Sequence, residues 1–283
     1  MIRISNDLTS PKAFTCDTYS YVTIVSTNEY LIGAIALNES LRRVNSEYPL
    51  TVVLSVNVDE NYEFFLHSYG IKYIRLTKCI KLPTSNKNPE YFHWNNTFDK
   101  LFIFELTQFK KIVFLDSDMM VVNNIDHLFQ KEHTSAVISD RINDESCTEF
   151  NSGLMVIVPE NGILIKMTNI IDLVASKLDN FGDQDIIRLF FSNWKENKGL
   201  ELDLGYNVYF PDVDVLFDRG YSLRGPQRIY IIHFVGTKKP WMFSPRKILR
   251  TFKRYNTILF LKYLNIICLI KVKLFFQKLF RYA

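Results

Sequence analysis

Short apolar runs alternate with segments of helical periodicity through the first two-thirds of the chain, and this alternation is the strongest constraint on the fold. Residues 21–25 form a β-branched run that predicts a strand, and the apolar residues between 31 and 44 then recur at helical spacing. A strand at 51–56, a helix at 61–68 and a strand at 71–76 follow with short connections. Units of this kind predict an α/β fold whose sheet is parallel at its core.

The middle of the chain continues the pattern. Residues 112–115 are apolar on both faces, which predicts a central buried strand. A Pro- and Asn-rich loop at 82–88 precedes it, and a helix is expected to begin at Asn96 or Thr97. The remaining predicted elements are strands at 136–139, 154–158 and 230–233, and helices at 163–177 and 183–191.

Asp116-Ser117-Asp118 directly follows the predicted central strand. Residues i and i+2 of an extended backbone project to the same side, so two carboxylates can approach one hard divalent cation. Ligands of open α/β sheets bind where strands end. The pattern alone is weak, because Asp183-Gln184-Asp185 and Asp212-Val213-Asp214 also match it. Only the first match follows an apolar strand, which favours metal binding there over a solvated turn.

Six blocks of sequence, in order between residues 20 and 242, resemble the glycogenin-like members of glycosyltransferase family 8. The resemblance implies a GT-A type nucleotide-sugar-binding fold, with a mostly parallel central sheet flanked by helices. It further implies a retaining hexosyltransferase that uses a UDP-sugar and Mn²⁺, with Mg²⁺ as the alternative ion. The blocks are 21–34, 97–118 with Thr97-Phe98-Asp99-Lys100-Leu101, Asn124-Ile125-Asp126-His127-Leu128-Phe129, Phe150-Asn151-Ser152-Gly153, Gly182-Asp183-Gln184, and His233-Phe234-Val235-Gly236 with Lys239-Pro240-Trp241.

Carried onto this chain, the resemblance implies a metal site and a donor site. Asp116, Asp118 and His233 would bind the metal, with a neutral imidazole completing an oxygen-rich set. The residues implied for the donor are Ser26, Thr27 and Tyr30 at the uracil and ribose, with Asn28 as an alternative, Gly236 and Lys239 at the diphosphate, Ser117 between the two aspartates, and Lys100, Asn151, Ser152, Asp183 and Gln184 around the sugar.

The resemblance offers no agreed enzymic nucleophile. A front-face displacement is therefore expected, in which the leaving phosphate oxygen helps to take the acceptor proton. Asp183, Gln184 and Lys100 are the implied catalytic residues, acting by orienting the sugar and stabilising charge. Structural interpretations stay open beside these roles: Asp183 and Gln184 could cap a helix, Lys100 could be a surface lysine, and His233 could be a satisfied core histidine.

Charge is distributed unevenly along the 283 residues. All 30 acidic residues lie at or before Asp218, whereas 15 of the 34 Lys and Arg residues follow it. A catalytic domain over 1–245 and a basic, helical segment over 246–283 are expected. The longest uncharged stretch of that segment, 263–270, is far shorter than the roughly 20 apolar residues that cross a bilayer.

Three interpretations of the basic segment are weighed. An amphipathic helix or helix pair could lie on an anionic membrane surface. A single helix could instead pack its apolar face on the catalytic domain, or on a second subunit in a homodimer. Nucleic acid is not an expected partner, because no recognition motif or stacking platform is present.

Composition indicates how large a core the chain can bury and in which compartment the protein is expected. With 47% hydrophobic residues, the chain can bury one large core. Its four cysteines are widely spaced without a C-x-x-C pair, and residues 1–20 contain no apolar run like a signal peptide. The expectation is a cytoplasmic protein, with peripheral membrane contact as an option. Its acceptor would be a glycan, a lipid-linked sugar or a protein side chain.

Two rival functions are weighed against the transferase. A sugar-nucleotidyltransferase would need a Gly-rich, basic loop after the first strand, and Ser26-Thr27-Asn28-Glu29 is not one. A catalytically inactive UDP-sugar-binding or scaffold protein on the same fold is the other rival. The presence of Asp116, Asp118, His233 and Lys239 argues against it, because loss of activity would be expected to erase those residues first.

Overall fold

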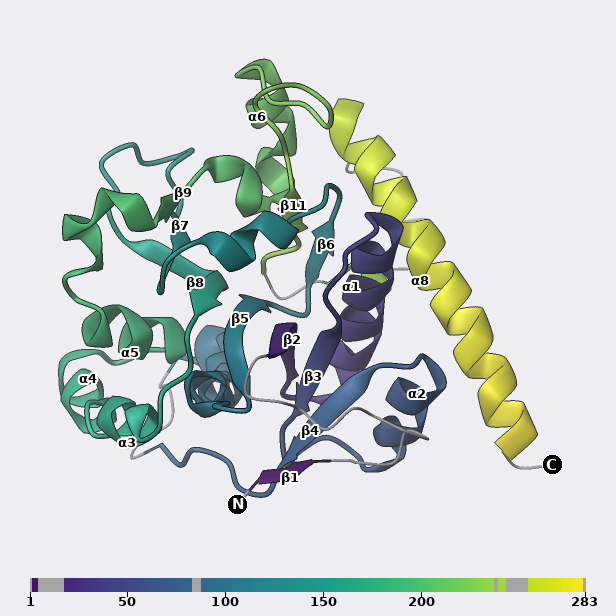
Figure 1. The fold of residues 1–283 in the computed structure, drawn as a ribbon, viewed down its shortest axis with the longest axis horizontal. Coiled ribbons are helices and arrows are strands. Elements are labelled where there is room, and N and C mark those ends of the chain that lie inside the picture. Colours follow the sequence, from purple (N-terminus) through teal and green to yellow (C-terminus); the bar gives the residue numbers. More distant parts are fainter. Residues whose placement is uncertain (1, 5–17, 83–87, 237–238, 243–253, 282–283) are drawn as a thin grey trace.

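The computed structural model describes residues 2–4, 18–82, 88–236, 239–242 and 254–281 (Figure 1). Its main sheet has eight strands in the order β1-β4-β3-β2-β5-β8-β7-β9. The four strands β4, β3, β2 and β5 are parallel, and β8 joins β5 antiparallel. The strands are β1 (Ile2–Ile4), β2 (Thr18–Val25), β3 (Leu50–Leu54), β4 (Lys72–Leu76), β5 (Phe109–Leu115), β7 (Ala136–Ile138), β8 (Phe150–Ile157) and β9 (Glu201–Leu202). The predicted parallel core of an α/β fold is confirmed.

A second sheet of three short strands stands at the end of β5. It consists of β10 (Val208–Tyr209), β11 (Ile231–His233) and β6 (Met119–Val121), with β11 antiparallel to β6. Strand β6 was not predicted, because its three residues follow the Asp-Ser-Asp segment without a break in pattern. Its pairing with β11 places His233 opposite Met119, one residue after Asp118.

Helices cover both faces of the main sheet (Figure 1). The α-helices are α1 (Leu31–Arg43), α2 (Asn61–Ser68), α3 (Ile163–Thr168), α4 (Ile171–Lys177), α5 (Asp183–Phe190), α6 (Val213–Asp218) and α8 (Arg254–Arg281). The 3-10 helices are Asn28–Tyr30, Pro89–Asn96, Phe98–Glu105, Asp126–Gln130, Trp194–Glu196, Lys198–Leu200, Leu204–Tyr206, Phe210–Asp212 and Pro240–Met242. Helices α1 and α8 belong to one buried cluster, while α3, α4 and α5 belong to a second.

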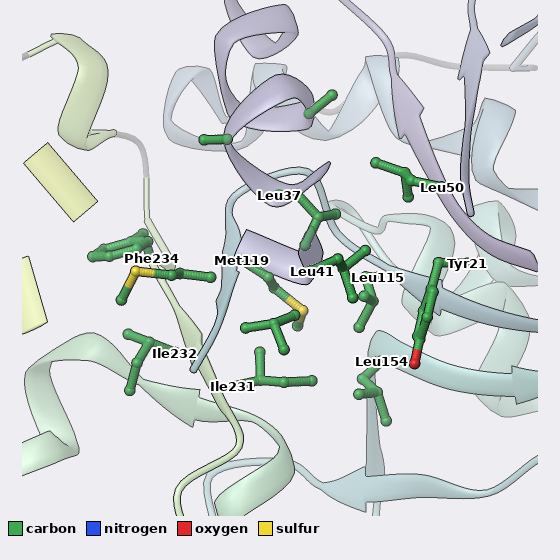
Figure 2. Close-up of a cluster of buried hydrophobic side chains, with 14 of the residues drawn as sticks. Tyr21, Leu37, Leu41, Leu50, Leu115, Met119, Leu154, Ile231, Ile232 and Phe234 are labelled. Atoms are coloured by element: carbon green, nitrogen blue, oxygen red, sulfur yellow. The ribbon is translucent and has the colours of Figure 1, made fainter. Parts of the chain in front are cut away.

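The first cluster fixes the end of β5. Figure 2 shows Leu115 of β5 and Met119 of β6 among side chains from α1, β8 and β11. Leu115 and Met119 are fully buried, as are Leu154 and Ile231. Because both ends of the intervening Asp116–Asp118 segment are anchored in close-packed core, its carboxylates are held in place.

Two predicted helices take another form. The helix expected from Asn96 or Thr97 is a pair of 3-10 helices, Pro89–Asn96 and Phe98–Glu105. Every side chain from Phe98 to Phe104 is buried. The segment therefore has no solvent-exposed side, and its sequence does not need the 3.6-residue alternation of an amphipathic α-helix. The helix predicted at 163–177 is interrupted after Thr168, whose hydroxyl donates to the carbonyl of Ile165, and continues as α4.

The described part of the basic C-terminal segment is one long helix, α8. Helix α8 lies beside α1 and also contacts α6 (Figure 1). Its inward face is buried through Leu259, Phe260, Tyr263, Ile266, Ile267 and Ile270. The expected boundary at 245/246 falls outside the described residues. Among the residues that are described, no helix combines the length and the apolar character needed to span a membrane.

Candidate active site

The Asp116–Asp118 segment crosses from β5 to β6 and is held by backbone bonds from two other strands. The amide of Asp116 donates to the carbonyl of Gly153 in β8 at 2.8 Å. The amide of Phe234, just after β11, donates to the carbonyl of Asp118 at 3.0 Å. Strands β8 and β11 therefore bring Gly153 and His233 to the two aspartates.

Asp116, Asp118 and His233 form a cluster suited to a metal ion. One ligand atom from each of the three lies within 4.8 Å of the others. Nε2 of His233 is 3.2 Å from an oxygen of Asp118 and 3.8 Å from one of Asp116. In the described part of the chain this is the single grouping of its kind, so neither other Asp-x-Asp match forms one.

Asn207 fixes the orientation of His233. Nδ1 of His233 lies 2.9 Å from the side-chain oxygen of Asn207. An amide oxygen only accepts, so Nδ1 donates to Asn207 and Nε2 is the ring nitrogen that faces the carboxylates. The amide nitrogen of Asn207 donates in turn to the side-chain oxygen of Asn151 at 2.8 Å. Sequence reasoning did not select Asn207, although the Tyr206-Asn207 pair before a short strand was a detectable signal.

Gly153 leaves the space that this cluster needs. A Cβ at that position would lie 2.7 Å from the side-chain oxygen of Asn151, 2.8 Å from Cε1 of His233 and 2.9 Å from an oxygen of Asp116. Any side chain would therefore enter the space that faces the candidate ligands.

Lys100 links the candidate metal ligands to the predicted sugar-binding residues. Its ammonium is 2.9 Å from Asp116 and 2.8 Å from Asp183, and its side chain is 8% exposed. Burial lowers the pKa of Lys100, but the two carboxylates outweigh burial and hold that pKa above its usual value. Ser152 completes the group, because its hydroxyl donates to a carboxylate oxygen of Asp183 at 3.3 Å and its amide donates to the side-chain oxygen of Gln184 at 2.8 Å.

The structure bears on two interpretations left open by the sequence: that Lys100 is a surface lysine, and that Asp183 and Gln184 cap a helix. Lys100 is buried rather than a surface lysine. Asn151, Ser152 and Gly153 belong to strand β8. Asp183 and Gln184 do begin α5, yet the side-chain cap to the Gly182 amide comes from Asp185.

Lys239 neutralises the second aspartate. Its ammonium contacts Asp118 and donates to the carbonyl of Phe234 at 2.9 Å. Burial raises the pKa of Asp118, but His233 and Lys239 outweigh burial and hold that pKa below its usual value. Gly236 follows with φ +87°, a left-handed conformation that favours glycine.

The predicted nucleotide residues lie between β2 and α1. Tyr30 is edge-on to Trp241 at 5.8 Å between ring centroids, and its ring is 5.7 Å from the ammonium of Lys239. Burial, then the charges of Asp118 and Asp116, raise the pKa of Tyr30. Ser26 and Thr27 are half-buried in the preceding loop. The side chain of the alternative, Asn28, accepts from the amide of Asp59 and is directed to the β3–α2 loop.

Ser117 is buried between the two aspartates and lies close to α1. Its carbonyl and the ring of Trp241 both contact the space where a Cβ of Gly33 would stand. Helix α1 thus approaches the site because Gly33 has no side chain. The structure therefore brings together, around the ends of β5, β8 and β11, the residues that were predicted to bind the metal, the diphosphate and the sugar.

A family model described as glycosyl transferase family 8 matches residues 21–244. The chain belongs to this family. The resemblance to family 8 is confirmed, and glycogenins are among the relatives: human glycogenin-1 is 29% identical over 239 residues, which are 80% of this chain and 63% of that protein.

Other family relatives differ in length. The putative UDP-glucuronate:xylan alpha-glucuronosyltransferase 3 of Arabidopsis thaliana is 31% identical over 229 residues, 79% of this chain and 34% of that protein. An uncharacterized protein of Acanthamoeba polyphaga mimivirus is 29% identical over 245 residues, 79% of this chain and 82% of that protein. This chain thus spans about a third of the length of the plant relative.

Solved structures confirm the GT-A type fold. The galactosyltransferase LgtC, in complex with donor and acceptor sugar analogs, aligns with a TM-score of 0.59 at 16% identity, covering 88% of this chain and 95% of LgtC. The glycosyltransferase GlyE of Streptococcus pneumoniae aligns with a TM-score of 0.57 at 19% identity, covering 92% of this chain and 64% of GlyE. At these identities the likeness concerns the fold alone.

Proposed function

We propose that this chain transfers a hexose from a UDP-sugar to an acceptor hydroxyl, with Mn²⁺ and with retention of anomeric configuration. The observation that carries the proposal is the cluster of Asp116, Asp118 and His233, flanked by the buried ammonium groups of Lys100 and Lys239. Carboxylates that bind a cation, next to lysines that bind phosphate, form a site for a metal-bound diphosphate.

The residues present fit a divalent ion. Two carboxylates and an imidazole whose Nε2 faces them match the ligand preferences of Mn²⁺, and Mg²⁺ is the alternative. Gly153 keeps the adjoining space clear of a side chain. When bound, the ion would act as a Lewis acid that neutralises the departing UDP.

The chain's own residues would hold the donor at both ends. Lys239 and Gly236 would bind the diphosphate, the first as a point charge and the second by close backbone approach. Tyr30, with Ser26 and Thr27, would line the nucleoside side. This arrangement requires the ammonium of Lys239 to exchange part of its contact with Asp118 for phosphate oxygens.

The sugar would lie between β8 and the start of α5. Asp183 and Gln184 reach this space from the helix, Ser152 from the strand, and Lys100 from between Asp116 and Asp183. These groups would orient the sugar and stabilise positive charge at its anomeric carbon. In a front-face displacement, the bond to the phosphate oxygen breaks as the acceptor oxygen bonds on the same face, and the phosphate oxygen takes the acceptor proton.

UDP release by the purified chain tests the proposal. The donors are UDP-glucose, UDP-galactose and UDP-glucuronate, each with Mn²⁺, Mg²⁺ or EDTA, because such enzymes hydrolyse their donor slowly without an acceptor. We expect release from one donor that needs Mn²⁺ and is lost in Asp118→Asn. The matched control is Asp214→Asn, which changes an Asp-x-Asp match on α6 outside the metal cluster.

Each alternative has its own outcome. Mn²⁺-dependent UDP binding without release from any donor would favour an inactive UDP-sugar-binding protein. Formation of a UDP-sugar from UTP and a sugar phosphate would favour a nucleotidyltransferase. Neither binding nor release would overturn the proposal.

A further inference from the structure

The face of α8 that points away from the catalytic domain carries a stripe of exposed apolar side chains. Ile258, Leu261, Leu269 and Val272 are each more than half exposed. Their spacing places them along one side of the helix, opposite the buried face that packs on α1 and α6. The helix therefore has two apolar faces, and packing within one copy of the chain uses only one of them.

We propose that this outer face of α8 lies on an anionic lipid bilayer. The helix contains six Lys and Arg residues and no Asp or Glu. Lys262 is exposed next to Leu261, and within the described residues it has no ion-pair partner. Lys262 and Arg43 lie beside the stripe, whereas Lys271 and Lys273 donate to the carbonyls of Trp241 and Ser68. An apolar stripe with basic groups beside it is the pattern of helices that lie in the plane of a membrane interface, where anionic lipids attract the basic groups.

A hollow beside the stripe fits a lipid headgroup. It has a volume of about 470 Å³ and lies between α8 and the end of α1. Its lining combines the apolar Ile258 and Leu261 with the basic Arg43 and Lys262. Arg43 also pairs with Glu39 at 3.0 Å, but both side chains are exposed, so this pair leaves the guanidinium accessible.

Charge selects the bilayer over other occupants. In a symmetric contact with a second copy, the same patch would meet itself, and α8, which contains no acidic residue, would bring its basic groups toward those of the other copy. Single-stranded nucleic acid would need aromatic rings on which bases stack. The exposed residues of the stripe are aliphatic instead.

The full chain, mixed with phosphatidylcholine vesicles with or without phosphatidylserine, tests this proposal by co-sedimentation. We expect binding to the phosphatidylserine vesicles that weakens as salt is added. Leu261→Glu combined with Leu269→Glu should lower the partition coefficient by at least about tenfold. The matched control is Ile165→Glu, which changes a 64% exposed residue on α3 and should leave partition unchanged.

A folding check keeps this result interpretable. Each variant should retain the melting temperature of the natural chain and its affinity for UDP, because the altered side chains are more than half exposed and do not belong to the candidate active site. The proposal concerns where the chain is held and does not depend on the transferase activity.

Cys268 provides a direct probe of insertion, because it is exposed on the outer side of α8. An environment-sensitive fluorophore on Cys268, with the other cysteines replaced by serine, should shift to shorter wavelength on adding phosphatidylserine vesicles. The same fluorophore on the exposed Cys79 should not shift. Absence of both sedimentation and shift would overturn the proposal. A shift without vesicles, together with a dimer mass by light scattering, would also overturn it and assign the face to a second copy.

Discussion

The side-chain oxygen of Asn207 lies 2.9 Å from Nδ1 of His233, which directs Nε2 of the imidazole toward Asp116 and Asp118. This arrangement resembles the outer-shell hydrogen bonds that orient metal-binding histidines generally. Asn207 therefore acts on the candidate metal site through His233: it contacts Nδ1, whereas Nε2 is the atom that faces the two aspartates.

Replacing Asn207 should therefore weaken metal binding without unfolding the protein. We expect Asn207→Leu to lower Mn²⁺ affinity by about 10- to 100-fold. Asn207→Asp keeps an acceptor for Nδ1 and should lose less. Titration calorimetry gives the affinities, and ¹⁵N NMR of the metal-free imidazole reports its tautomer. Equal Mn²⁺ affinity in Asn207→Leu and the natural chain would show that Asn207 has only a packing role.

Gly153→Ala tests the space beside the ligands. The new methyl group would stand 2.8 Å from Cε1 of His233, so either the imidazole or strand β8 must move. We expect Mn²⁺ affinity to fall by more than about tenfold. Gly182→Ala is the control, because its methyl group would meet Thr97 and Trp94 at an ordinary 3.7 Å. If Gly153→Ala binds Mn²⁺ normally, the site must lie elsewhere along the Asp116–Asp118 segment.

Lys100→Met should reveal the charge balance of the metal-free site. Removing the ammonium leaves Asp116 and Asp183 buried without their cation, which costs about 3–5 kcal/mol of unfolding free energy. Saturating Mn²⁺ should restore part of that loss, because the ion brings positive charge back to Asp116. Urea denaturation with and without Mn²⁺ measures both effects. Lys166→Met, which removes an exposed pair with Glu160, should change neither.

Asp126 gives the fold a predictable pH dependence. Its carboxylate accepts from the Tyr21 hydroxyl at 2.7 Å, from the Ser46 hydroxyl at 2.7 Å and from the amide of Glu47 at 2.9 Å. Burial raises the pKa of Asp126, but these donors outweigh burial and hold that pKa below its usual value. The stabilisation is therefore complete above the unfolded value of about 3.9 and is lost as pH falls through the folded value.

We expect Asp126→Asn to lower the free energy of unfolding near neutral pH by about 1–2 kcal/mol. The difference from the natural chain should shrink as the solution is acidified below about pH 4, because the protonated carboxyl then resembles the amide. Urea denaturation across pH measures it. A difference that stays constant down to acid pH would exclude charge as its origin.

The sequence predicted those strands and helices that have a clear hydrophobic pattern. Most of the strands and helices of the first two-thirds were predicted to within a few residues, and Asp116 and Asp118 were chosen because they follow a strand that is apolar on both faces. That choice rested on a local rule, since strand ends in a parallel sheet meet at one edge. The rule needed no knowledge of which distant residues arrive there.

What the sequence could not supply depends on contacts between distant segments. Strand β6 has only three residues and exists because β11, more than a hundred residues later, pairs with it. The 3-10 form of Phe98–Glu105 follows from burial on all sides, which no periodicity records. Asn207 gains its role only when β10 is laid beside β11, so its partner His233 was found without it.

Lys100 and Lys239 neutralise the carboxylates that the ion would otherwise bridge. With the proposed ion absent, we expect the protein to keep its folded shape, because the lysines already supply positive charge to these carboxylates. Supply of the ion would then limit catalytic turnover rather than the amount of folded protein, and chains without the ion would stay folded and able to bind it.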